Sequence, residues 1–236
     1  MPHPPVLPFL ACEGPTDRDF LLPIILRTFE EIAAAIPVEV IPQDPETVRL
    51  FSGNGRSFEQ SVRQAAAEAE RYGNGCVVLC VPKDADSATG RQAHQTLWAA
   101  FAAVTQPADA GPMAGFAAVA GTDPPVCHKL VALVPVHEME AWVMADKPAL
   151  LAAMQTTLPL PALGLDHAPE SYSNPKQALT DALAVARKHG APPVTRTDLY
   201  QQLGQSLTPA QLAAVPSYRA FREAVRAAFR QLGYLR

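Results

Sequence analysis

The most constraining feature of this sequence is an alternation of short apolar runs with longer amphipathic stretches. The short runs are bounded by turn residues, which is typical of buried strands. The longer stretches carry apolar residues at helical spacing. Strands that alternate with helices in this way favour an α/β fold with a mostly parallel sheet flanked by helices. The strands are predicted at 6–12, 38–41, 76–81 and 130–136, and the intervening helices at 16–32, 57–72 and 91–104.

Capping patterns predict where these helices begin. Thr16 with Asp19, and Ser57 with Gln60, have the spacing of a capping box, in which two side chains satisfy the free N–H groups of the first turn. Pro23 lies beyond the first turn of the first helix, so we expect a local kink there.

Beyond residue 150 the sequence indicates helices only. Asn174 followed by Pro175 predicts one helix start, Thr208 with Gln211 predicts another, and a last helix opens at Ser217. We therefore divide the chain into an α/β core, residues 1–150, and a helical C-terminal extension of the same domain, residues 151–236. A stretch rich in Ala, Gly and Pro, residues 105–125, is expected to form a surface insertion or a lid.

Composition and cysteine usage narrow the class of protein. Apolar residues make up 48% of the chain, enough for a packed core, and no apolar run reaches the roughly 18 residues of a membrane span. No secretory signal is evident at the N-terminus, so we expect a cytoplasmic protein. The cysteines lie in or beside apolar runs with no spacing suited to zinc, so reduced thiols are expected. They are Cys12, Cys76, Cys80 and Cys127.

Acidic residues follow three of the predicted strands. They are Glu13 after the first, Asp84 and Asp86 after the third, and Glu138 and Glu140 after the fourth. The carboxyl ends of parallel strands meet at the edge of the sheet where ligands bind. Residues at i and i+2 of extended backbone also share a side. Because carboxylate oxygens suit Mg²⁺ or Mn²⁺, the pattern predicts a divalent-metal site.

Each acid taken alone has a simpler interpretation. Asp86 is well placed to cap the next helix, and Glu138 and Glu140 suit a helix N-terminus, where the dipole favours negative charge. For Glu13 this alternative is weaker, because Thr16 already supplies a cap. Agreement among three strand ends favours the metal site. The net charge of −4 argues against a generic basic nucleic-acid binder but not against a metal nuclease, whose acids are neutralised by bound cations.

Several other polar residues are weaker candidates. His137 adjoins the acids and is suited to bind substrate, metal or a water, or to be a structural histidine. Lys176 is suited to meet a phosphate, or to be solvated in the first turn of its helix. The turn 53–56 is suited to cradle a phosphate. In the last helix Arg222 and Arg226 lie on a face suited to track a nucleic-acid backbone, or to keep an exposed surface soluble. That face comprises Arg219, Arg222, Arg226 and Arg230.

The same residues carry a family resemblance. The block Glu13-Gly14-Pro15-Thr16-Asp17 before an apolar helix resembles the first signature of TOPRIM domains, and Asp84-Ala85-Asp86 resembles the second. With the blocks His137-Glu138-Met139-Glu140-Ala141-Trp142 and Asn174-Pro175-Lys176, the chain resembles a TOPRIM-like family of bacterial proteins catalogued as domain-of-unknown-function family 4276. The resemblance covers about residues 6 to 180. This family is in turn similar to the TOPRIM domains of the OLD-type nucleases.

The resemblance implies roles for the acids. Glu13 would be the general acid/base and a metal ligand, Asp84 and Asp86 would hold Mg²⁺ or Mn²⁺, and Glu138 and Glu140 would complete the site, with Lys176 as a second catalytic candidate. The implied substrate is DNA or RNA, in a setting of defence against phage. The sequence has no Walker motif, so an ATPase, as in the OLD-type nucleases, would be a separate partner.

Three functions follow as hypotheses. The first is metal-dependent cleavage of phosphodiesters in nucleic acid. The second is phosphoryl or nucleotidyl transfer on a small nucleotide. The third is a non-catalytic binding module that recruits an ATPase.

Overall fold

The computed structural model describes residues 5–36, 40–50, 57–73, 77–85, 90–105 and 129–235. In the first half of the chain the elements are β1 (Leu7–Cys12), α1 (Pro15–Ala34), β2 (Glu46–Arg49), α2 (Phe58–Gly73), β3 (Val77–Pro82), α3 (Arg91–Thr105) and β4 (Leu130–Leu133). Then follow α4 (Glu140–Val143), α5 (Lys147–Ala153), the 3₁₀ turns η1 (Leu160–Leu163) and η2 (Pro169–Ser171), α6 (Pro175–Lys188), α7 (Arg196–Ser206), α8 (Pro209–Leu212) and α9 (Pro216–Gln231).

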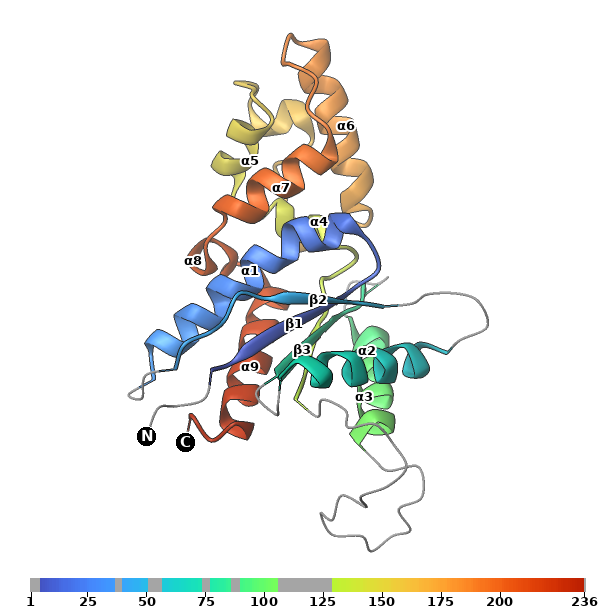
Figure 1. Cartoon of the computed structure of the whole chain (residues 1–236). Coiled ribbons are helices and arrows are strands. Elements are labelled where there is room, and N and C mark those ends of the chain that lie inside the picture. Colours follow the sequence, from blue (N-terminus) through green and yellow to red (C-terminus); the bar gives the residue numbers. More distant parts are fainter. Residues whose placement is uncertain are drawn as a thin grey trace, which may run out of the picture.

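The strands of the described ranges form one parallel sheet in the order β2-β1-β3-β4. Figure 1 shows α2 and α3 on one side of this sheet and α1 and α9 on the other. The central strand β3 is buried on both faces, with Val78 and Cys80 packed toward α1 and α9, and Leu79 and Val81 toward α2 and α3. This double burial explains its continuous apolar sequence and confirms the predicted α/β class.

The second strand lies later in the chain than predicted. It is Glu46–Arg49 rather than 38–41; residues 37–39 lie outside the described ranges, and Ile41 is 58% exposed. The strand β2 pairs with β1 alone. Only Val48 of its four residues is buried, because an edge strand covers the core with one side chain in two. The apolar criterion therefore selected the wrong segment.

One of the two predicted caps in the core is wrong. Helix α1 begins at Pro15, after Gly14, with no side-chain cap, and Asp19 bonds Arg18 instead of the helix N-terminus. Proline at the first helical position needs no N–H partner, which makes the Thr16 cap unnecessary. The helix continues through Pro23 to its end.

Three other predicted helix caps are confirmed, whereas α9 begins at Pro216 with no side-chain cap rather than at Ser217. The Ser57 N–H donates to Gln60 Oε1 (3.0 Å), and the Gln60 N–H donates to Ser57 Oγ (3.3 Å). The Asn174 side chain accepts from the backbone of Gln177 at the start of α6 (2.8 Å). The capping box of Thr208 with Gln211 opens the short helix α8.

The helical extension and the strands share one hydrophobic core. Trp142 of α4 is fully buried, packs edge-on against Tyr218 of α9 with ring centroids 5.4 Å apart, and donates its indole N–H to Ser217 Oγ (2.7 Å). Figure 1 shows α4 to α8 grouped above the sheet, while α9 returns to cover its face. The residues after 150 therefore complete the core of the α/β unit.

Membrane spans and thiols can be followed in the described ranges. None of their helices is both long and apolar enough to cross a membrane. Cys12 and Cys80 take part in no disulfide within these ranges. Cys76, Cys127, the turn 53–56 and most of the insertion at 105–125 lie outside these ranges.

Candidate active site

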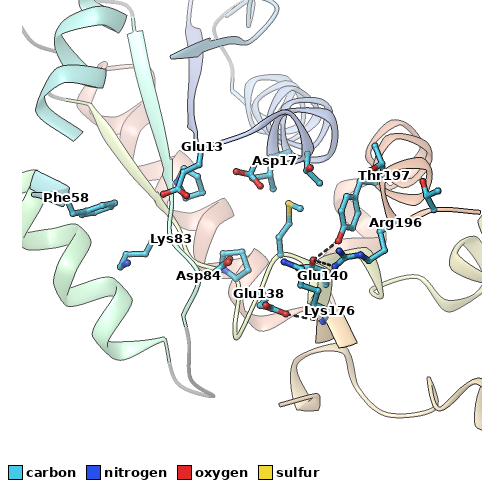
Figure 2. A pocket seen from close by; sticks show the side chains of 17 residues that line it. Glu13, Asp17, Phe58, Lys83, Asp84, Glu138, Glu140, Lys176, Arg196 and Thr197 are labelled. Carbon is cyan, nitrogen blue, oxygen red and sulfur yellow. Dashed lines mark hydrogen bonds and ion pairs between the residues drawn. The ribbon is translucent and has the colours of Figure 1, made fainter. Parts of the chain in front are cut away.

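A cleft of about 690 Å³ lies where β1, β3 and β4 reach their carboxyl ends. Figure 2 shows the strand ends and α1 on one side of it, and α6 and α7 of the helical extension on the other. Its acidic lining residues are Glu13, Asp17, Asp84, Glu138 and Glu140, and its cationic ones are Lys83, Lys176 and Arg196. The structure therefore brings together four of the five acids selected from the sequence, together with Lys176. The fifth, Asp86, lies outside the described ranges.

The acids next to β1 carry uncompensated charge. The Glu13 side chain is exposed, and no hydrogen bond or ion pair to it is found within the described ranges. Burial raises the pKa of Asp17, and the negative charges of Glu13 and Glu140 raise it further, against the opposing effect of backbone groups at residues 13 and 14. These like charges face one cleft, which is a favourable setting for a bound cation.

A tight turn after β4 positions Glu138. His137 has a φ of 62°, and the Glu138 N–H donates to the Val136 carbonyl (2.9 Å), which closes a three-residue turn. The Glu138 Oε2 accepts from the Lys176 backbone N–H (3.0 Å). Glu138 thus caps a helix N-terminus, that of α6, through one oxygen. Within the described part of the chain its second oxygen has no partner.

Glu140 is held more firmly than Glu138. It is the first residue of α4 and only 6% exposed. Its Oε1 accepts from the Tyr200 hydroxyl (2.5 Å) and lies 3.8 Å from Arg196 Nη1. Burial, with the hydrogen bond to Glu140, raises the pKa of Tyr200 far above its usual range, so this hydroxyl remains a donor. The second oxygen of Glu140 has no hydrogen bond to any described residue.

Asp84 and Lys83 extend the cleft beyond the end of β3. The Lys83 backbone N–H donates to the Leu133 carbonyl (2.9 Å), which ties this segment to β4. The Lys83 ammonium lies over the Phe58 ring, 5.0 Å from its centroid, a cation–π contact. Both side chains line the cleft.

Three of the predicted substrate-binding residues lie elsewhere. His137 is half-buried and is not part of the cleft wall. Arg222 forms an ion pair with Glu31 of α1. Arg226 lies 3.5 Å from Glu223 Oε1 and borders a separate hollow of about 210 Å³. The arginine face of α9 and the acidic cleft are therefore two distinct surfaces.

The donor chemistry of the cleft fits Mg²⁺ or Mn²⁺. Glu138 and Glu140 are each oriented by a hydrogen bond to one oxygen and offer the other, and hydrogen-bond partners commonly orient metal ligands in this way. Among the described side chains, no three His, Cys, Asp or Glu converge tightly enough to enclose a metal as they stand. Mg²⁺ keeps several waters and needs only one or two carboxylates directly, so an open carboxylate cleft suits it.

Sequence reasoning missed several residues of this cleft. Asp17 belongs to the block that carries the resemblance, but the pattern of acids directly after strands does not single it out. Arg196 and Tyr200 come from α7, which opens with a capping box of Thr195 and Asp198. The Thr-x-x-Asp spacing marks that helix start in the sequence. Nothing local indicates that this start faces the strand ends.

Comparison with protein-family models, with curated proteins and with solved structures gave no match for this chain. The interpretation of the cleft therefore depends on its own residues and geometry.

Proposed function

We propose that this protein is a Mg²⁺- or Mn²⁺-dependent phosphodiester-cleaving enzyme, a TOPRIM-like nuclease acting on DNA or RNA. One observation carries the proposal: carboxylates that follow three different strands line a single cleft at the carboxyl edge of a parallel sheet, with cationic side chains beside them. Acids that hold a divalent cation and cations that bind phosphate oxygens are the two requirements of phosphodiester chemistry.

The chain's own residues divide the work. Glu13, Asp84, Asp86, Glu138 and Glu140 are the residues that would hold the metal. When bound, the metal would supply a Lewis acid for a phosphoryl oxygen. Glu13 is exposed and without a hydrogen-bond partner in the described ranges, so it is suited to exchange a proton with an attacking or leaving oxygen. Lys176 is suited to bind a substrate phosphate near Glu138. The Glu138 carboxylate accepts a hydrogen bond from the Lys176 backbone N–H.

Cleavage by the purified chain tests this proposal. Labelled single-stranded DNA, double-stranded DNA and RNA are incubated in Mg²⁺ or Mn²⁺, and we expect cutting that stops in chelator. Glu13→Gln should slow cutting by about 10² to 10⁴-fold, the scale for losing a general acid/base. Asp84→Ala and Asp84→Asn should lose cutting and also the rise in melting temperature that Mn²⁺ gives the wild type.

Glu70→Gln, an acid-to-amide change on α2 outside the cleft, is the matched control and should cut normally. If Glu13→Gln and Asp84→Ala both cut at the wild-type rate, the activity comes from another site or a contaminant and the proposal is wrong.

The size of the cleft favours one alternative. A volume of about 690 Å³ lies within the usual range for small-molecule sites, which suits phosphoryl or nucleotidyl transfer on a small nucleotide. Turnover of nucleoside triphosphates with no cleavage of polynucleotides would identify that activity. Metal binding without any turnover would instead favour a binding module.

The cellular setting belongs to the same proposal. We propose a cytoplasmic protein that acts in defence against phage, with a separate ATPase as partner. Co-purification with an ATPase whose nucleotide hydrolysis changes the rate of cutting would support that setting.

A further inference from the structure

Lys83 lines the cleft and forms no ion pair with the acids that the structure describes there. Its ammonium lies over the Phe58 ring and makes no ion pair with any described residue, although Asp84 is its neighbour in sequence and both line the cleft. The aromatic face restrains the side chain without removing its charge or its three N–H donors. The ammonium of Lys83 is thus restrained by the ring and keeps its N–H donors for a further partner.

Arg196 is in a similar state on the opposite wall. Its side chain is 36% exposed, and within the described ranges its guanidinium has one charged neighbour, Glu140 Oε1 at 3.8 Å, which is too far for a hydrogen bond. Guanidinium carries five donors in a planar fork that matches the oxygens of a phosphate. Since Glu140 is itself fixed by Tyr200, Arg196 is oriented by one distant contact and keeps its donors open.

The two cations flank the acids. Figure 2 shows Lys83 beside Phe58 on one side of the cleft and Arg196 beside Thr197 on the other, with Glu13, Asp17, Asp84, Glu138 and Glu140 between them. They come from the end of β3 and the start of α7, two elements on separate walls. The two cations therefore approach the acids from opposite sides of the cleft.

We propose that Lys83 and Arg196 bind two different phosphates of one extended substrate strand, on either side of the phosphate that lies at the acids. This inference rests on the proposed function and narrows it. The preferred ligand is a flexible strand with at least three consecutive phosphates, as in single-stranded DNA or RNA, rather than a mononucleotide. Such a strand contacts both cations at once, whereas a mononucleotide has one phosphate and contacts only one of them.

The test measures binding rather than cutting. A labelled single-stranded hexathymidylate is titrated by fluorescence anisotropy in Mn²⁺ at several salt concentrations, in a Glu13→Gln background that keeps the strand intact. Lys83→Gln and Arg196→Gln should each weaken binding by about tenfold, the scale for a charged hydrogen bond. Each should also reduce the slope of log K against log salt by about 0.7, and the double variant by about 1.4.

The controls separate a binding role from a structural one. Lys188→Gln, an exposed lysine at the far end of α6, should leave affinity and slope unchanged. Arg196→Lys keeps the charge and should retain the slope even if it loses affinity. Thymidine 5′-monophosphate should compete only weakly with the labelled strand. Because it has one phosphate, the effects of Lys83→Gln and Arg196→Gln on its binding should not add.

The salt slopes and affinities of the variants decide whether the two cations bind separate phosphates. Unchanged slopes in both single variants, or no binding of the strand at all, would overturn the inference. A double variant no weaker than either single one would also overturn it, because both cations would then contact one phosphate. Additive slopes with no metal-dependent cutting by the wild type would refute the nuclease and retain the two-phosphate strand site.

Discussion

The two walls of the cleft hold their carboxylates differently. On the wall beside β1, Glu13 is exposed and has no hydrogen-bond partner in the described ranges. On the wall beside the helical extension, Glu140 is 6% exposed and Tyr200 fixes one of its oxygens. Glu13 on the first wall is therefore suited to exchange a proton, and Glu140 on the second wall is suited to keep a bound ion in a fixed position. The helical extension is part of the site because it supplies that fixation.

The walls are joined where α7 crosses α1. A Cβ atom on Gly204 of α7 would lie 2.6 Å from the Asp19 carbonyl oxygen and 2.9 Å from the Phe20 Cα. Only glycine permits this approach, since both neighbours are backbone atoms. Arg27 of α1 strengthens the crossing by donating from Nη1 to the Gln205 carbonyl (2.8 Å) and from Nη2 to the Gly204 carbonyl. The distance between the walls thus depends on a contact outside the cleft.

Gly204→Ala should reduce the stability of the fold more than a change in either wall. Alanine raises helix propensity by about 1 kcal/mol, but the added methyl must push α7 away from α1. We expect a net loss of about 2–3 kcal/mol in the free energy of unfolding, measured with urea. Because the shift also separates the two walls, the Mn²⁺-induced rise in melting temperature should shrink.

Gln202→Ala, an exposed position on the same helix, is the control for propensity and should change stability by less than about 0.5 kcal/mol. A stable Gly204→Ala with an intact Mn²⁺ response would mean that the two walls are not coupled through this crossing.

Tyr200→Phe should have an intermediate effect on the free energy of unfolding. The change alters only the wall that contains Glu140. The ring packing against Phe20 is retained, while buried Glu140 loses its short hydrogen bond. Leaving a buried acceptor without its donor costs about 1–2 kcal/mol, which urea unfolding can measure. Tyr72→Phe, at a tyrosine that is 68% exposed, is the matched control and should be neutral. If Tyr200→Phe and Tyr72→Phe change stability equally, the hydrogen bond from Tyr200 does not hold Glu140 in place.

The strand-side wall was largely predictable from the sequence, and the helical wall was not. Glu13 and Asp84 follow apolar strands, and a parallel sheet brings such ends to one edge. Arg196 and Tyr200 reach the cleft through a tertiary contact between α7 and α1 that no local pattern encodes. The strand at Glu46–Arg49 was missed for a related reason: an edge strand needs few apolar residues, so its identity depends on its neighbour β1.

Asp17→Asn should have the smallest effect and tests the charge on the strand-side wall. Burial raises the pKa of Asp17, with the charges of Glu13 and Glu140 adding to it, so the folded protein binds this proton more tightly than the unfolded chain. The resulting stabilisation is fully present below the unfolded pKa of 3.8 and is lost as pH rises through the folded pKa. At pH 7 the ionised side chain therefore destabilises the fold.

Removing the Asp17 charge should raise the free energy of unfolding at pH 7 by no more than about 0.5 kcal/mol, and this gain should vanish near pH 3 and below. The Asp198 carboxyl supplies a control of opposite sign. Hydrogen bonds from Thr195 lower its pKa, so its stabilisation is present at neutral pH and lost on acidification. Mn²⁺ should reduce the gain from Asp17→Asn, because a bound cation neutralises the same repulsion. A gain that is independent of both pH and Mn²⁺ would show that Asp17 acts through packing, and that the strand-side wall carries no excess charge for a cation to relieve.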